Sequence, residues 1–203
     1  MKKLLILCVA VLLGAGSSAR AMDVIPPPWR GDPGSTMQQW EFSVFDLTPV
    51  PDVVRNPYGD PLLWANTHGW IPQLDCRQGI WPLSGEIDVY IPNAPYAPEK
   101  LIWIQLTWKA GNEVNPYLPD EPMVGVTPFD KIIISRTDTL VDCGWTHSIF
   151  AIDMWPNPIG EWITIKGDIL VDELVIDTIC PEPATIALLG LGGLALHGIR
   201  RKR

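Results

Sequence analysis

Hydrophobic and polar residues alternate through much of the middle of the chain. In EIDVYI (86–91) every second residue is aliphatic, and in KLIWIQLTWK (100–109) the even-numbered positions from 102 to 108 are apolar. A period of two residues is that of a β-strand with one buried face. Runs of this kind, rich in Ile, Val, Thr and Trp, predict strands at 39–47, 86–91, 100–109, 131–135, 148–154, 161–166 and 170–179.

Turn residues separate these runs. Asn-Pro, Pro-Asn and Gly-Asn pairs lie between them, and the chain has 21 prolines, which argues against long helices. The pattern therefore predicts an all-β fold, an antiparallel β-sandwich of jelly-roll type over residues 38–180. Residues 22–37, with Pro-Pro-Pro and several glycines, are typical of an irregular lead-in. The lead-in contains Arg30-Gly31-Asp32, a tripeptide known from adhesion proteins.

The first 21 residues have the three parts of a secretory signal peptide. Lys2 and Lys3 precede an apolar run at 4–13, and Ala19-Arg20-Ala21 forms a small-x-small cleavage site. The run is too short to span a bilayer as a helix. Residues 1–21 are therefore predicted to form a signal helix that is removed on export.

The last residues form a second segment of unusual composition. Pro181-Glu182-Pro183 is followed by residues 184–199, which carry no formal charge, and then by Arg200, Arg201, Lys202 and Arg203. A helix over 184–199 would be roughly 24 Å long, somewhat short of the ~30 Å hydrocarbon core, and the terminal cations could extend it by snorkelling. Physical chemistry alone thus predicts a single transmembrane helix with its basic tail in the cytoplasm.

This ending resembles the PEP-CTERM sorting signal. Pro181, Glu182 and Pro183, the apolar run and the basic tail stand in the order of that signal, over residues 181–203 of a chain with a signal peptide. The resemblance implies processing by an exosortase, a membrane-embedded transpeptidase, in a Gram-negative bacterium that makes exopolysaccharide and biofilm. Pro181–Pro183 would be the recognised motif. The protein would be held in the membrane by its C-terminus before processing and lie at the cell surface or outside the cell afterwards. The opening WRGDPGSTMQQWEF also resembles uncharacterised PEP-CTERM proteins of planctomycete-like bacteria.

The body is strongly acidic. Residues 22–183 hold all 23 Asp and Glu but only eight Lys and Arg, a net charge of −15. Such a body repels nucleic acid and anionic lipid, and it tolerates neutral sugars. No cofactor is predicted. Ca²⁺ is the one candidate metal, at Asp168, Asp172, Glu173 and Asp177, although these residues lack a D-x-D-x-D loop.

No catalytic constellation stands out, so the body is predicted not to be an enzyme. The sequence contains neither G-x-S-x-G nor H-E-x-x-H. Glu86 and Asp88 would share one strand face, which is ordinary for an exposed strand. A secreted glycan-active enzyme is the least favoured alternative.

The tryptophans offer a binding hypothesis instead. All ten lie in residues 22–183, and Trp rings often stack on sugar rings. Trp64, Trp70 and Trp81 lie in loop-rich sequence, and Trp103 faces away from the apolar side of its strand. These four are candidates for glycan stacking, with core packing as the alternative for each. The leading hypothesis is a structural or adhesive surface protein associated with exopolysaccharide, and a carbohydrate-binding module is the runner-up.

Three cysteines follow the signal segment: Cys76, Cys143 and Cys180. An exported protein can form disulfides, and three cysteines allow one bridge and one free thiol. Because Cys143 and Cys180 flank the last predicted strands, we expect these two to pair.

Overall fold

The computed structural model describes residues 25–67, 69–94, 97–111, 114–127 and 132–181, which form antiparallel strands and one short 3-10 helix. The elements are β1 (Ser35–Trp40), β2 (Val53–Arg55), β3 (Leu62–Thr67), β4 (Ile71–Leu74), β5 (Arg77–Pro92), β6 (Lys100–Ala110), β7 (Met123–Thr127), β8 (Ile132–Leu140), η1 (Asp142–Gly144), β9 (Thr146–Met154) and β10 (Gly160–Ile179). The predicted all-β class is confirmed.

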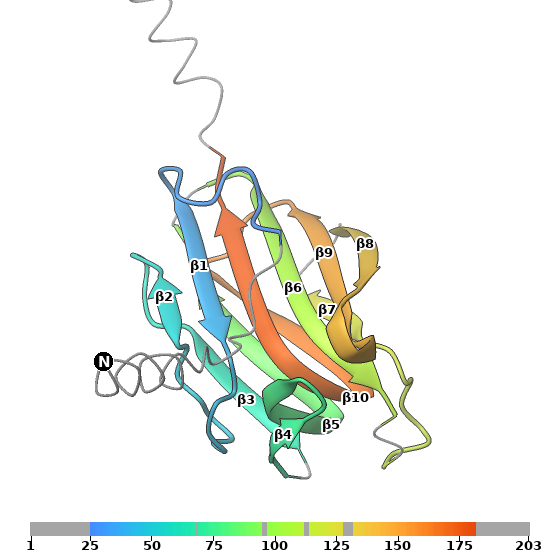
Figure 1. Cartoon of the computed structure of the whole chain (residues 1–203). Helices are drawn as coiled ribbons and strands as arrows, with labels where there is room; N and C mark the ends of the chain where they lie inside the picture. Colours follow the sequence, from blue (N-terminus) through green and yellow to red (C-terminus); the bar gives the residue numbers. More distant parts are fainter. Residues whose placement is uncertain (1–24, 68, 95–96, 112–113, 128–131, 182–203) are drawn as a thin grey trace, which may run out of the picture.

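The strands form two layers that face each other across a hydrophobic core (Figure 1). The front layer has the order β2-β1-β10-β6-β9-β8. In the rear layer, β5 pairs with β3 on one side and with β10 on the other, and β10 also pairs with β7. Strand β4 forms a hairpin with the start of β5.

The 20-residue strand β10 belongs to both layers. Its first part, from Gly160 to Val171, pairs with β5, and its last part, from Leu174 to Ile179, pairs with β1 and β6. The register of β10 against β6 shifts between Val171 and Glu173. An irregularity of this kind bends the strand that contains it, which allows β10 to pass from one layer to the other. The sandwich is therefore one bent ten-stranded sheet and not the two separate sheets of a jelly roll.

The apolar positions of the alternating runs fill the space between the layers. Ile87, Val89 and Ile91 of the rear layer and Ile102 and Ile104 of the front layer are at most 1% exposed and belong to one cluster. The alternation in the sequence therefore assigned the inward positions of β5 and β6 correctly. At roughly 1.5–3 kcal/mol for each fully buried aliphatic side chain, this cluster is a major source of stability.

Several strand boundaries differ from the prediction. The run predicted as a strand at 39–47 is strand only to Trp40, because Phe42 has a positive φ of 47° and its ring turns into the core. The runs at 161–166 and 170–179 are one strand, because Gly167 and Asp168 continue the ladder to β5 instead of forming a turn. The short strands β2, β3, β4 and β7 lie in sequence that shows no clear alternation.

The predicted signal helix at 1–21 and the transmembrane helix at 184–199 lie outside the described residues. Within the described ranges, no helix has the length and apolar character needed to cross a membrane.

Candidate functional site: an aromatic face on the rear layer

Three aromatic side chains cluster on the outer face of the rear layer. Trp64 of β3, Tyr90 of β5 and Trp162 of β10 occupy outward positions, because their neighbours Leu63, Val89 and Ile163 point into the core. The Trp162 ring lies 5.1 Å from that of Trp64 and 5.2 Å from that of Tyr90, between centroids. We call Trp64, Tyr90 and Trp162 the aromatic face.

The two tryptophans of the aromatic face are exposed to solvent, whereas Tyr90 is half-buried. Trp64 is 42% exposed and Trp162 is 38% exposed, which is high for side chains of this size. Strand pairing places Tyr90 directly opposite Trp162. A Cβ atom at Gly160 would overlap the Tyr90 ring, so the ring can lie here only because residue 160 has no side chain.

Polar groups adjoin the aromatic face on the same strands. Asp88, which pairs with both Trp64 and Thr164, accepts a hydrogen bond of 2.6 Å from the Thr164 hydroxyl. One step further, Lys166 forms an ion pair of 2.9 Å with Glu86, and both side chains are more than 40% exposed. Glu86 and Asp88 therefore share an outer face as predicted, and each has a polar partner.

The four tryptophans proposed for glycan stacking do not lie together. Only Trp64 is part of the aromatic face. Trp81 is fully buried and stacks on Phe42 with 4.2 Å between ring centroids, so its candidacy was wrong: the alternation of β5 turns it inward. Trp70 packs against the core, and its indole donates a 2.8 Å hydrogen bond to the Phe42 carbonyl. Trp103 lies on the front layer, half-buried, where its indole donates to the Ile25 carbonyl of the lead-in.

Tyr90 and Trp162 were not among the predicted candidates. The signal for both was present, since each occupies the outward position of an alternating run. The pairing that brings β3 and β10 to either side of β5 could not be predicted from the alternation of residues alone.

The cysteine pairing also differs from the prediction. Cys76 is bonded to Cys143, and Cys180 is a free, buried cysteine. Strands β9 and β10 both run antiparallel to β6, which lies between them, so they are parallel to each other. Cys143 precedes the start of β9 and Cys180 follows the end of β10, which places the two at opposite ends of the front layer.

The four carboxylates considered for Ca²⁺ have separate protein partners. Asp168 accepts from the backbone of Val114, Asp172 pairs with Arg77, Glu173 accepts from Gln39, and Asp177 pairs with Arg30. Within the described part of the chain, no group of three or more His, Cys, Asp or Glu side chains could hold a metal ion. The calcium hypothesis therefore has no structural support there.

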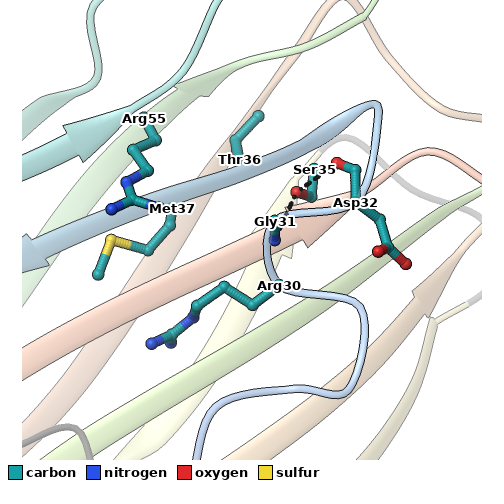
Figure 2. A pocket seen from close by; sticks show the side chains of 7 residues that line it. All are labelled: Arg30, Gly31, Asp32, Ser35, Thr36, Met37 and Arg55. Carbon is teal, nitrogen blue, oxygen red and sulfur yellow. Dashed lines mark hydrogen bonds between the residues drawn. The ribbon is translucent and has the colours of Figure 1, made fainter.

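The Arg-Gly-Asp tripeptide lies in a turn beside a hollow of about 340 Å³. Figure 2 shows Arg30 and Arg55 on either side of Met37, in keeping with the pairing of Met37 with both Arg55 and Asp177. The Arg30 guanidinium donates two hydrogen bonds, of 2.6 and 2.5 Å, to Asp177. The guanidinium of the tripeptide is therefore bound to the protein's own sheet.

The far end of β10 leads straight into the predicted sorting segment. Cys180 is 9% exposed and lies near the backbone of Gly34 in the lead-in. Burial raises the pKa of its thiol, and the positive charge of the nearby Lys100 offsets only part of this increase. Pro181, the next residue, is half-buried and is the last residue that the structure describes.

Residues 180–203 match the family model described as the PEP-CTERM protein-sorting motif. The chain carries a PEP-CTERM sorting motif. This match confirms the resemblance of the last residues, and the motif implies export and processing by an exosortase. It covers the ending and not the sandwich. Neither the curated proteins nor the solved structures that were compared with the chain contain a match.

Proposed function

We propose that this protein is a non-enzymatic component of the cell surface or extracellular matrix whose sandwich binds exopolysaccharide through the aromatic face. The cluster of Trp64, Tyr90 and Trp162, in which both tryptophans are exposed and the tyrosine is half-buried, supports this proposal. An aromatic ring presents a flat apolar surface that suits the C–H face of a sugar ring. The Asp88 carboxylate and the Thr164 hydroxyl adjoin the aromatic face on the same strands, and in this proposal they form hydrogen bonds with hydroxyl groups of the bound sugar.

The charge of the protein restricts the polysaccharides that suit it. With a net charge of −15 over residues 22–183, the body repels polyanions at long range. The proposed ligand is therefore a neutral polysaccharide. In this account the apolar run at 184–199 anchors the protein in the membrane until an exosortase acts at Pro181–Pro183, and the sandwich is then released to the surface or the matrix.

Binding of soluble neutral glucans to single-residue variants tests the proposal. Trp64→Ala and Trp162→Ala should each weaken binding several-fold, on the scale of about 0.5–1.5 kcal/mol for one aromatic contact. Tyr117→Ala is the matched control, since Tyr117 is an aromatic residue with 95% exposure outside the aromatic face. Affinity electrophoresis would measure the binding, and circular dichroism would verify the fold.

Two results would contradict the proposal. If the glucan retarded Trp64→Ala and Trp162→Ala as strongly as it retards Tyr117→Ala and the wild-type protein, the aromatic face would not be the binding site. Turnover of the glucan by the wild-type protein, lost in a carboxylate variant such as Asp88→Asn, would instead indicate a glycan-active enzyme.

A further inference from the structure

A lysine, an asparagine and a glutamate are buried together at one end of the sandwich. Lys100 is the first residue of β6, Glu161 is the second residue of β10, and Asn93 follows the last residue of β5. Lys100 and Glu161 are 0% exposed and Asn93 is 6% exposed. Lysine is almost never fully buried, and the desolvation of a buried ion pair can exceed its attraction. The cluster therefore calls for an explanation beyond stability.

The three side chains form a closed ring of contacts. The Lys100 Nζ lies 2.6 Å from Glu161 Oε1 and also contacts Asn93 Oδ1. The Asn93 Nδ2 donates to Glu161 Oε2 and, at 3.0 Å, to the Pro158 carbonyl. The backbone N–H of Asn93 donates to the Ile159 carbonyl at 3.0 Å, which fixes the amide in place.

This arrangement brings a nucleophile next to an electrophilic carbon. The Lys100 amine touches the oxygen of the Asn93 carboxamide, so it lies beside the carbonyl carbon Cγ. An amine attacks only when it is neutral, and burial lowers the pKa of Lys100, against the opposing influence of Glu161. A simple ion pair would need Lys100 and Glu161 alone, whereas the asparagine adds a group with which the amine can react.

Glu161 is placed to move the protons of that reaction. One carboxyl oxygen contacts the attacking nitrogen, Lys100 Nζ, and the other contacts the nitrogen that would leave, Asn93 Nδ2. A single carboxyl group can thus accept a proton from the first nitrogen and donate one to the second, which is general acid–base catalysis.

We propose that Lys100 and Asn93 become joined by an intramolecular amide bond, formed with the help of Glu161. Lys100 transfers a proton to Glu161, and the neutral Nζ attacks Asn93 Cγ. Glu161 then protonates Nδ2 and takes up a proton from Nζ. The Cγ–Nδ2 bond breaks, ammonia leaves, and an Nζ–Cγ amide remains. The exchange is redox-neutral, and no external reagent is required.

The bond would link the residue after β5 to the first residue of β6, next to the end of β10, where the sorting segment begins. β6 pairs with the last part of β10, with Leu101 opposite Ile179. Cys180 and the motif follow directly, so a body held by its C-terminus would be pulled at this end. A covalent link there would hold the end of the rear layer to the start of the front layer.

Mass spectrometry of the denatured wild-type protein tests the bond directly. We expect a mass lower by that of one ammonia, about 17 Da, after the disulfide is accounted for. A Glu-specific protease cleaves after Glu99, between the two linked residues. It should therefore yield the peptide ending at Glu99 and the peptide beginning at Lys100 as one joined species. Recovery of these two peptides separately, at unmodified masses, would overturn the proposal.

Variants separate the roles of the three residues. Lys100→Arg and Glu161→Gln should yield separate peptides, whereas Asn93→Asp should retain the link with loss of water, about 18 Da, in place of ammonia. A link that persists in Lys100→Arg would place it on other residues and contradict the assignment. The wild-type result stands whether or not a variant folds, and it is independent of polysaccharide binding.

Discussion

Asp172 is a buried carboxylate whose surroundings make the stability of the protein depend on pH. It is 1% exposed and lies 3.1 Å from the Arg77 guanidinium. Burial raises its pKa to about 6, although Arg77 acts in the opposite direction. The ordinary pKa of 3.8 applies to the unfolded chain. Between these values the folded state binds more protons, so the free energy of unfolding falls as pH rises.

The substitution Asp172→Asn should therefore flatten this pH dependence. Between about pH 4 and pH 7 the wild-type protein should lose on the order of 2–3 kcal/mol of unfolding free energy through this group, and the variant should lose correspondingly less. Urea unfolding at both pH values would measure the difference. Parallel pH profiles for the two proteins would show that Asp172 is not the group responsible.

Individual residues could be predicted where the alternation was regular. The inward positions Ile102 and Ile104 and the outward position Tyr90 follow from a period of two. Trp81 was misassigned because proline and glycine on either side made its segment resemble a loop, whereas it is a buried part of β5. The Lys100–Asn93–Glu161 cluster carried no sequence signal, because its members come from three separate strand ends.

The hairpin of β4 and β5 is tied to the β8–β9 connection by the disulfide between Cys76 and Cys143. Lys109 of β6 reinforces this contact, since its Nζ donates to Asp75 Oδ2 at 2.7 Å and to the Cys143 carbonyl at 3.3 Å. The two cysteines are 67 residues apart in the chain. A bridge over so long a loop restricts the unfolded chain, which stabilises the folded state.

Removal of this disulfide should cost about 2–4 kcal/mol of unfolding free energy. The double variant Cys76→Ser/Cys143→Ser should unfold at lower denaturant concentration than the wild-type protein. Cys180→Ser is the control and should leave the bridge in place. Non-reducing peptide mapping would identify the bonded pair, and a peptide that joins Cys143 to Cys180 would contradict the structure.

The order and pairing of the strands could not be predicted from the sequence. Residues 161–166 and 170–179 read as two strands because Gly167-Asp168 resembles a turn. In the structure Asp168 continues β10 and accepts hydrogen bonds from the backbone of Val114 and Asn115. The short strands β2 and β4 depend on their partners β1 and β5, so their existence follows from tertiary contacts and not from local pattern.

The protein as a whole combines an acidic β-sandwich with an ending that determines its destination. The sorting motif was the part most readily predicted, because it is a contiguous pattern whose order can be read directly. Of the three residues of the aromatic face, only Trp64 was predicted, because the three side chains come together only through the pairing of β3, β5 and β10. Its use in polysaccharide binding remains our proposal, whereas export and exosortase processing are implied by the motif itself.

The most direct test of this account is the mass of the C-terminal peptide of the protein recovered from outside its own cells. Processing at the sorting motif predicts a C-terminus near Pro181–Ala184, without the apolar run and the Arg-Arg-Lys-Arg tail. The working protein would then be the sandwich alone. A C-terminal peptide that still ends at Arg203 would contradict the account and would mean that the ending is a permanent anchor.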